Sequence, residues 1–283
     1  GNVMERAVYN ALFAAESPDG RSLRYFCPLE GTRTYFDRDT FCCPNNFRRI
    51  MAELPAMIYY RTNDGVSVNL YTQSTAQMDL GGGRKVTIEQ KTDYPSSGLV
   101  DIAVTPSETM EFPLQVRIPG WCQKASLSIT EHSRIDVPLG TRSYEFRRAW
   151  RPGDSITLEM AMPWRFVRGR KSQAGRVALM RGPVVYCIGS ANNGGLLAQC
   201  QKPADLIIEP ASLGAPVADT AIRPGGMKVV AKAWPPDADT KTSPPHDVTL
   251  TEFVDATCVT TYFRLSDPSV AVDDELSSSL SVK

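Results

Sequence analysis

The sequence has 283 residues, of which 42% are hydrophobic and 22% charged, a balance that allows about two globular domains with buried cores. Lys and Arg total 31, and Asp and Glu also total 31. This neutral balance argues against nucleic acid or an anionic membrane surface as the main partner. No run of about 18 apolar residues occurs, so we expect no membrane-spanning helix.

Histidine and cysteine content limits the possible chemistry. The two histidines, His132 and His246, lie in polar, loop-like stretches, which argues against a histidine-based metal site or a Ser-His-Asp triad. Catalysis would then depend on Cys, Asp, Glu, Tyr or Arg. The seven cysteines are odd in number and unevenly spaced, which favours free thiols or metal ligands over a disulfide framework. Free thiols favour a cytoplasmic or periplasmic location of the protein, without deciding between the two.

A helix is predicted at the beginning of the chain. Its apolar residues fall on one helical face: Val3, Met4, Ala7, Val8, Ala11 and Leu12. The turn-forming residues 17–20 end it. Because this pattern starts immediately after Gly1, we expect the chain to begin inside a domain, as a piece of a longer protein.

Two adjacent cysteines, Cys42 and Cys43, mark the start of a second predicted helix. Its apolar residues recur with a period of 3.6: Phe47, Ile50, Met51, Leu54, Met57 and Ile58. Pro44 suits the first helical turn, and Pro55 should kink or shorten the helix. A thiol at this end lies near the positive pole of the helix dipole, which favours the thiolate. A thiolate is both the better nucleophile and the better metal ligand.

From about residue 62 the hydrophobic period changes to two, which predicts β-strands. Turn signals separate the apolar runs at intervals of about 10–15 residues, the pattern of a β-sandwich. Gly81–Gly83 lacks the strand–helix context of a nucleotide-binding loop and predicts a hairpin turn. Further strands are predicted at 177–188, 227–234, 248–253 and 260–265. The predicted fold class is therefore mainly β with an N-terminal α segment.

The cysteine pair has two interpretations from the residues alone. Cys42 and Cys43 are either small core residues at a helix start or two ligands of a zinc-thiolate site, because soft thiolates select zinc. Two adjacent cysteines supply at most two of four ligands. Cys27 is the nearest other thiol and Glu30 the nearest carboxylate, so the sequence does not show a complete site.

Other candidate residues have stronger structural interpretations. Glu5 on a helix is more often solvated than catalytic, and Glu30 after Pro28 and Leu29 suggests a structural hydrogen bond. Glu16 is the third candidate acid. Tyr25 is as often a core residue as a ligand contact. We expect the remaining cysteines to be buried small apolar residues: Cys122, Cys187, Cys200 and Cys258.

Several blocks, in this order, resemble the C-terminal part of glycoside hydrolase family 127, the β-L-arabinofuranosidase family. They are Met4–Asn10 (MERAVYN), Tyr25–Glu30 (YFCPLE), Cys42–Asn46 (CCPNN), Val116–Trp121 (VRIPGW), Tyr144–Asp154 (YEFRRAWRPGD) and Val177–Tyr186 (VALMRGPVVY). The resemblance covers roughly residues 2–190. It implies that residues 1–60 end an α/α-barrel catalytic domain, that 61–190 form a β-sandwich, and that 191–283 add a further β segment.

The resemblance also implies a mechanism: a retaining glycosidase whose cysteine nucleophile is held on Zn²⁺. Cys42 matches the nucleophile and a zinc ligand, Cys43 matches a second zinc ligand, and Tyr25 matches a tyrosine near the substrate. The family's other ligands, from a Glu-x-Cys motif, and its general acid/base lie further upstream. Those roles therefore do not fall on Glu5, Glu16 or Glu30.

The sequence departs from the family pattern at two positions: Asn45 replaces the second proline after the cysteines, and Cys27 replaces an asparagine. The implied substrate is a plant-derived oligosaccharide with β-linked L-arabinofuranose or a related furanoside. Without the upstream ligands, we expect this chain alone to bind zinc poorly and to be inactive. The alternative is a non-catalytic carbohydrate-binding or structural β-sandwich module. A third possibility is a zinc-dependent enzyme acting on another sugar.

Overall fold

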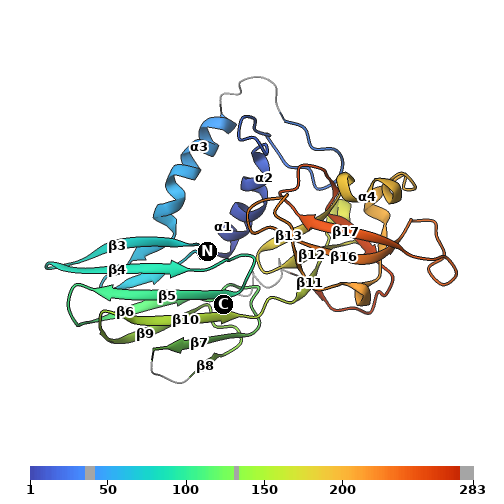
Figure 1. Cartoon of the computed structure of the whole chain (residues 1–283). Helices are drawn as coiled ribbons and strands as arrows, with labels where there is room; N and C mark the ends of the chain where they lie inside the picture. The colour runs from blue at the N-terminus through green and yellow to red at the C-terminus, as the bar shows by residue number, and fades with distance from the viewer. Residues whose placement is uncertain (36–41, 131–133, 275–283) are drawn as a thin grey trace. The chain divides into compact units, whose positions relative to one another are not determined.

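The structure, a computed structural model, describes residues 1–35, 42–130 and 134–274 (Figure 1). Its contacts divide the chain into two compact units, which we describe separately. Unit 1 comprises Gly1–Glu5 and Asn45–Met162, and unit 2 comprises Arg6–Pro44 and Pro163–Lys283. Among the described residues, strands dominate over a few short helices, which confirms the predicted mainly β class. No helix in the described ranges is long and apolar enough to cross a membrane.

Both predicted helices form. The first consists of α1 (Asn2–Ala7), a π-helical turn (Val8–Leu12) and α2 (Phe13–Ala15). The second, α3 (Cys43–Glu53), gives way to a 3₁₀ turn at Leu54–Met57, where Pro55 lacks the N–H that the α-helix needs. No α3 side chain is buried, so its apolar face is only partly covered by the described chain.

Unit 1 contains two sheets. The first has the strand order β1 (Tyr59–Arg61), β2 (Val66–Val68), β6 (Met110–Arg117) and β9 (Ser143–Trp150), with β2 and β6 parallel. The second has the order β3 (Ser74–Gly81), β4 (Arg84–Lys91), β5 (Leu99–Pro106), β10 (Asp154–Met160), β7 (Ala125–Ile129) and β8 (Ile135–Val137). Strands β5 and β9 contact each other between the sheets.

Alternating apolar residues form the core of unit 1. Val100, Ile102 and Val104 of β5 are fully buried, whereas the intervening Asp101 is exposed. The period-two pattern therefore gives each strand one buried face. The predicted hairpin is present between β3 and β4, and its three glycines, Gly81 to Gly83, all have positive φ.

Unit 2 holds a barrel-like sheet. Six strands pair in a closed ring: β12 (Val177–Arg181), β13 (Val184–Gly189), β17 (His246–Glu252), β16 (Met227–Trp234), β14 (Ile207–Ile208) and β19 (Tyr262–Leu265). Outside the ring, β11 (Trp164–Arg168), β15 (Val217–Ala218), β18 (Cys258–Thr260) and β20 (Val272–Asp273) add to it. Helix α4 (Ser190–Leu197) and 3₁₀ turns at Lys171–Gln173, Pro203–Asp205 and Pro210–Ser212 connect the strands. Buried Leu179, Ile188, Val229 and Leu250 contribute to the core.

Strands β11 to β13 differ from the expected arrangement. The family resemblance implied one β-sandwich over residues 61–190, but these three strands join the sheet of unit 2. An apolar residue at every second position buries one face of a strand in a sandwich and in a barrel alike. The pattern therefore predicts the strands correctly without assigning them to a sheet.

Candidate active site

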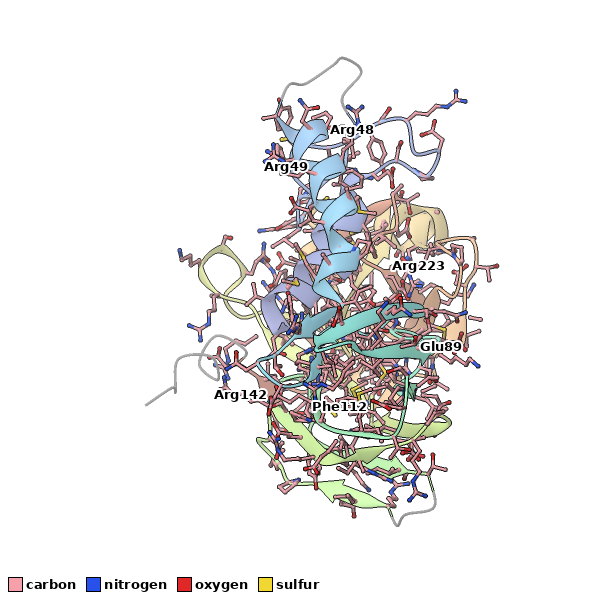
Figure 2. The ribbon with its side chains drawn as sticks, turned by 90° about the vertical axis from the view of Figure 1, so that its left-hand side faces the viewer. Arg48, Arg49, Glu89, Phe112, Arg142 and Arg223 are labelled. Atoms are coloured by element: carbon pink, nitrogen blue, oxygen red, sulfur yellow. The ribbon has the colours of Figure 1, made fainter. Side chains whose placement is uncertain are left out.

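The two adjacent cysteines lie at the beginning of α3. Cys42 immediately precedes the helix and is exposed, and Cys43 is its first residue and half-buried. Their Sγ atoms are 3.7 Å apart. Pro44 occupies the first turn, as expected, and Arg48 and Arg49 project outward from the helix (Figure 2). The described chain therefore does not use the pair as core packing residues.

Tyr25 is the aromatic neighbour of the first cysteine. Its Oη lies 3.9 Å from Cys42 Sγ, and the residue is 43% exposed. Hydrogen bonds to Cys42, first from Cys43 and then from Tyr25, lower the pKa of the Cys42 thiol. Partial desolvation and its bond to Cys42 raise the pKa of Cys43. The arrangement therefore makes Cys42 the more acidic thiol of the two.

The chain before Tyr25 is attached to the first helical segment. The Arg24 N–H donates to Ala15 O at 2.9 Å, and Glu16 and Leu23 form an isolated antiparallel bridge. The Arg24 guanidinium lies 3.9 Å above the ring of Tyr35 and donates to its hydroxyl. Backbone and side-chain contacts together thus fix the direction in which the chain enters Tyr25.

The spacing of the two sulfur atoms fits zinc, the metal that the resemblance implies. Two thiolates on a tetrahedral Zn²⁺, with Zn–S bonds of about 2.3 Å, lie about 3.8 Å apart. The observed separation is 3.7 Å. The described residues contain no group of three or more His, Cys, Asp or Glu side chains able to hold a metal. Cys42 and Cys43 therefore suit two of four zinc ligands.

Comparison with known families places this cysteine pair in a matched catalytic segment. Residues 2–56 match the domain described as "Beta-L-arabinofuranosidase, GH127 catalytic domain". Residues 65–162 match the GH127 middle domain, and residues 168–252 match the glycoside hydrolase family 127 C-terminal domain. Three domains of one family thus match consecutively along the chain. The chain belongs to glycoside hydrolase family 127.

Individual relatives agree with this family assignment. The chain is 30% identical, over 218 residues, to a non-reducing end β-L-arabinofuranosidase of Bifidobacterium longum subsp. longum. That alignment covers 69% of this chain and 32% of the relative, so the chain spans about a third of the curated protein.

Solved structures show the same fold. The crystal structure of a GH127 β-L-arabinofuranosidase from Geobacillus stearothermophilus T6 matches with a TM-score of 0.78 and 28% identity, covering 93% of this chain and 46% of that one. A structure titled "Glycoside hydrolase" has the same TM-score of 0.78 at 23% identity, covering 94% of this chain and 48% of that one; it supports the fold alone.

The three glutamates considered from the sequence have structural contacts in this family 127 chain. Glu5 was expected to be solvated but is only 1% exposed, because its carboxylate accepts hydrogen bonds from Arg117, Tyr94 and Trp121. Glu30 pairs with Thr260 through its backbone, and its carboxylate accepts a bond from Gln173. Glu16 takes part in the backbone bridge to Leu23.

All seven cysteines of the family 127 chain are free thiols, and none belongs to a group of three or more possible metal ligands among the described residues. Cys122, Cys187 and Cys258 are buried, as predicted, but Cys200 is only half-buried. Cys27 is half-buried, with its Sγ 3.7 Å from Ala11 O. Of the two histidines, His132 lies outside the described residues and His246 begins β17.

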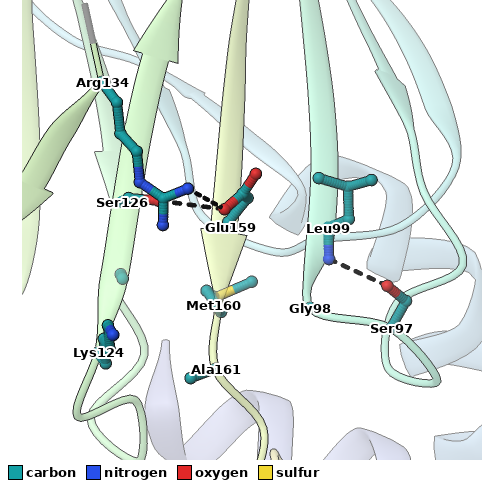
Figure 3. Close-up of a pocket in the computed structure, with 10 residues that line it drawn as sticks. Ser97, Gly98, Leu99, Lys124, Ser126, Arg134, Glu159, Met160 and Ala161 are labelled. Carbon is teal, nitrogen blue, oxygen red and sulfur yellow. Dashed lines mark hydrogen bonds and ion pairs between the residues drawn. The ribbon is translucent and has the colours of Figure 1, made fainter.

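Unit 1 also contains a shallow pocket of about 390 Å³ near the ends of β5, β7 and β10 (Figure 3). Its polar lining includes Lys124, and Glu159 accepts bonds from Arg134 and Ser126. None of its ten lining residues is aromatic. The pocket therefore lacks the flat apolar surface on which a sugar ring would stack.

Proposed function

We propose that the protein to which this chain belongs is a retaining β-L-arabinofuranosidase that uses Cys42 as its nucleophile. The substrate class is a plant-derived oligosaccharide carrying β-linked L-arabinofuranose or a related furanoside. The observation that carries the proposal is the pair of exposed Cys42 and half-buried Cys43, with sulfur atoms 3.7 Å apart, inside the segment matched by the family's catalytic domain.

Cys42 would attack the anomeric carbon while the bond between that carbon and the leaving oxygen breaks. A general acid, which the resemblance places upstream of residue 1, would protonate the leaving oxygen and later activate water. Water would then displace Cys42 Sγ, and two successive displacements retain the anomeric configuration. Tyr25 Oη lies close enough to orient the Cys42 sulfur between these steps.

Cys42 and Cys43 would hold the zinc ion through their sulfur atoms. When bound, zinc would keep the thiol of its ligand ionised and make it a better leaving group in the second displacement. Cys43, half-buried at the first turn of α3, would anchor the site to the helix.

Helix α3 supports a proposed place for residues 1–60 at the end of an α/α barrel. An amphipathic helix gains stability by burying its apolar face. Phe47, Ile50, Leu54 and Met57 are only half-buried in the described chain. Helices from other parts of an α/α barrel would cover this face.

Substitution of Cys42 in the complete protein tests the proposed function. We expect Cys42→Ser to reduce turnover of an aryl β-L-arabinofuranoside by more than about 10³-fold, because the weaker hydroxyl nucleophile replaces the thiolate. Cys200→Ser, at a half-buried cysteine away from the pair, should retain turnover. Circular dichroism checks that both variants fold.

The alternative is a non-catalytic carbohydrate-binding or structural module. It predicts equal behaviour of the Cys42→Ser and Cys200→Ser proteins and sugar binding without hydrolysis. The solvent-exposed Cys42 beside Cys43 and the lack of aromatic residues among the lining residues of the unit 1 pocket favour the enzyme.

A further inference from the structure

The segment after Tyr25 is paired with strand β18 of unit 2. Gly31 N donates to Val259 O and Thr261 N donates to Leu29 O, both at 2.8 Å. Between these bonds, Glu30 and Thr260 form an antiparallel bridge. Residues 29–31 therefore act as a short additional strand on the edge of the C-terminal β-structure.

Arg33 provides a second attachment of this segment to unit 2. It is only 6% exposed, and its guanidinium lies 3.9 Å above the ring of Phe253. Its Nη1 donates to the carbonyl oxygens of Phe253 and of Asp255, the latter at 3.2 Å. Its Nε and Nη2 are buried without an acceptor among the residues that the structure describes. Burial of an incompletely paired guanidinium is costly, which makes Arg33 a candidate for a specific structural role.

Apolar packing contributes little to the position of this segment. Phe26 is 72% exposed and Leu29 is 45% exposed. The backbone bonds to β18 and the Arg33 guanidinium therefore hold the segment, together with the contact of Cys27 with Ala11 O and the bond from Gln173 to Glu30. Only residues 26–28 separate Tyr25 from the paired residues, and Pro28 restricts the backbone of this link.

We propose that Arg33 is a positioning residue that holds Tyr25 Oη against Cys42 Sγ. The C-terminal β-structure would thereby be a part of the catalytic scaffold and not an appended module. The inference rests on the proposed function, since it assigns Tyr25 to the site of the nucleophile. Loss of the guanidinium would release residue 33 from the carbonyls of Phe253 and Asp255 and leave only the backbone pairing of residues 29–31 with β18, which would allow Tyr25 to move away from the sulfur.

A double-mutant cycle in the complete protein tests whether Arg33 acts through Tyr25. The four proteins are the wild type, Arg33→Met, Tyr25→Phe and the double variant. We expect each single change to lower kcat by about 10- to 100-fold with KM changed by less than about threefold. The double variant should be no slower than the slower single variant, because both changes remove the same contact.

Arg165→Met provides the matched control. Arg165, on β11, is also buried in unit 2 and donates to Asp273 and Gly182 O, which lie outside residues 23–35. Its substitution should lower the melting temperature and leave kcat within about twofold. If Arg33→Met does not fold, Arg33→Lys should show a smaller loss of kcat in the same direction.

Multiplicative losses in the double variant would overturn the proposal, as would an Arg165→Met protein with the same loss of kcat as Arg33→Met. If the wild type does not cleave arabinofuranosides, the proposed function fails. In that case, the rate at which iodoacetamide alkylates Cys42 is measured in the same four proteins after metal removal, as a second test of the Arg33–Tyr25 coupling. Alkylation rates that differ from that of the wild type and are equal in the two single variants and the double variant would support the Arg33–Tyr25 coupling. Additive changes, or rates equal to that of the wild type, would refute it.

Discussion

At the scale of single residues, Glu5 shows how one buried carboxylate organises its surroundings. Its Oε1 accepts bonds of 2.6 Å from both Arg117 Nη2 and Tyr94 Oη, and its Oε2 accepts one of 3.3 Å from Trp121 Nε1. Asn2 Oδ1 also accepts bonds from Arg117 and from Gly120 N. Asn2 and Glu5 thus attach the start of α1 to Arg117 on β6 in unit 1, and Glu5 has no direct part in the proposed chemistry.

Replacing this carboxylate should destabilise the protein strongly. We expect Glu5→Gln to lower the free energy of unfolding by about 3 kcal/mol, because Arg117 is left as a buried charge without its partner. Urea denaturation measures the change. Glu89→Gln is the control, since its ion pair with Lys91 is solvent-exposed and should contribute less than about 1 kcal/mol. Equal losses in the two variants would contradict this account.

Asp205 should make stability depend on acidic pH. Burial opposes ionisation of its carboxyl, but bonds from Arg176 and the nearby Arg264 outweigh burial and lower its pKa below 3.8. A carboxyl with a lowered pKa in the folded state contributes stability above its unfolded pKa, and this contribution is lost as pH falls through the folded pKa.

Asp205→Asn should therefore be less stable than the wild type at pH 6, with a difference that shrinks as the pH falls below about 4. Urea denaturation between pH 3 and pH 6 measures this difference. Asp136→Asn, at an exposed side chain, should show little difference at any pH. A difference for Asp205→Asn that grows on acidification would show that the Arg176 pair is not the cause.

At the scale of elements, the β3–β4 hairpin depends on backbone conformation. Gly82 has a φ of +64° and open space around it, so a new side chain would be strained by the backbone alone. Gly82→Ala should lower the free energy of unfolding by about 1 kcal/mol. Gly194→Ala, in α4 and also in open space, should raise it by about 0.5 kcal/mol. The same sign for both changes in urea denaturation would contradict this assignment.

Local sequence signals were sufficient to predict where the main helices and strands lie. The predicted strand 227–234 is β16 with the same bounds, because apolar residues at alternate positions of this strand point to its buried face. Pro55 ends α3 as expected, since the missing N–H acts locally. The ring closure of β12 to β19 was not predictable, because it depends on pairing between strands distant in sequence.

The same distinction applies to the candidate site. Cys42 and Cys43 were selected because adjacent thiols at a helix start are unusual and match a family pattern, and Tyr25 was selected from that pattern alone; their roles stay predictions. Arg33 and Glu5 were missed or misjudged because their partners, Phe253 and Arg117, lie far along the chain. A charged residue in a short motif gives no sign of burial by itself.

At the scale of the whole molecule, the described residues hold no group of three or more possible metal ligands, and the chain spans about a third of its curated relative. We expect the 283-residue chain alone to retain far less than one zinc per chain after dialysis and to show no arabinofuranosidase activity. Metal analysis and an aryl β-L-arabinofuranoside assay test this. Stoichiometric zinc together with turnover would show that the chain completes the site by itself.

The identity of the nucleophile is tested most directly by trapping the sugar on the complete protein. After reaction with an activated β-L-arabinofuranosyl substrate and rapid acid quenching, peptide mass spectrometry locates the attached group. Our account predicts one pentosyl residue on Cys42, absent from the Cys42→Ala protein. A pentosyl group on another side chain, or unchanged turnover by Cys42→Ala, would contradict it.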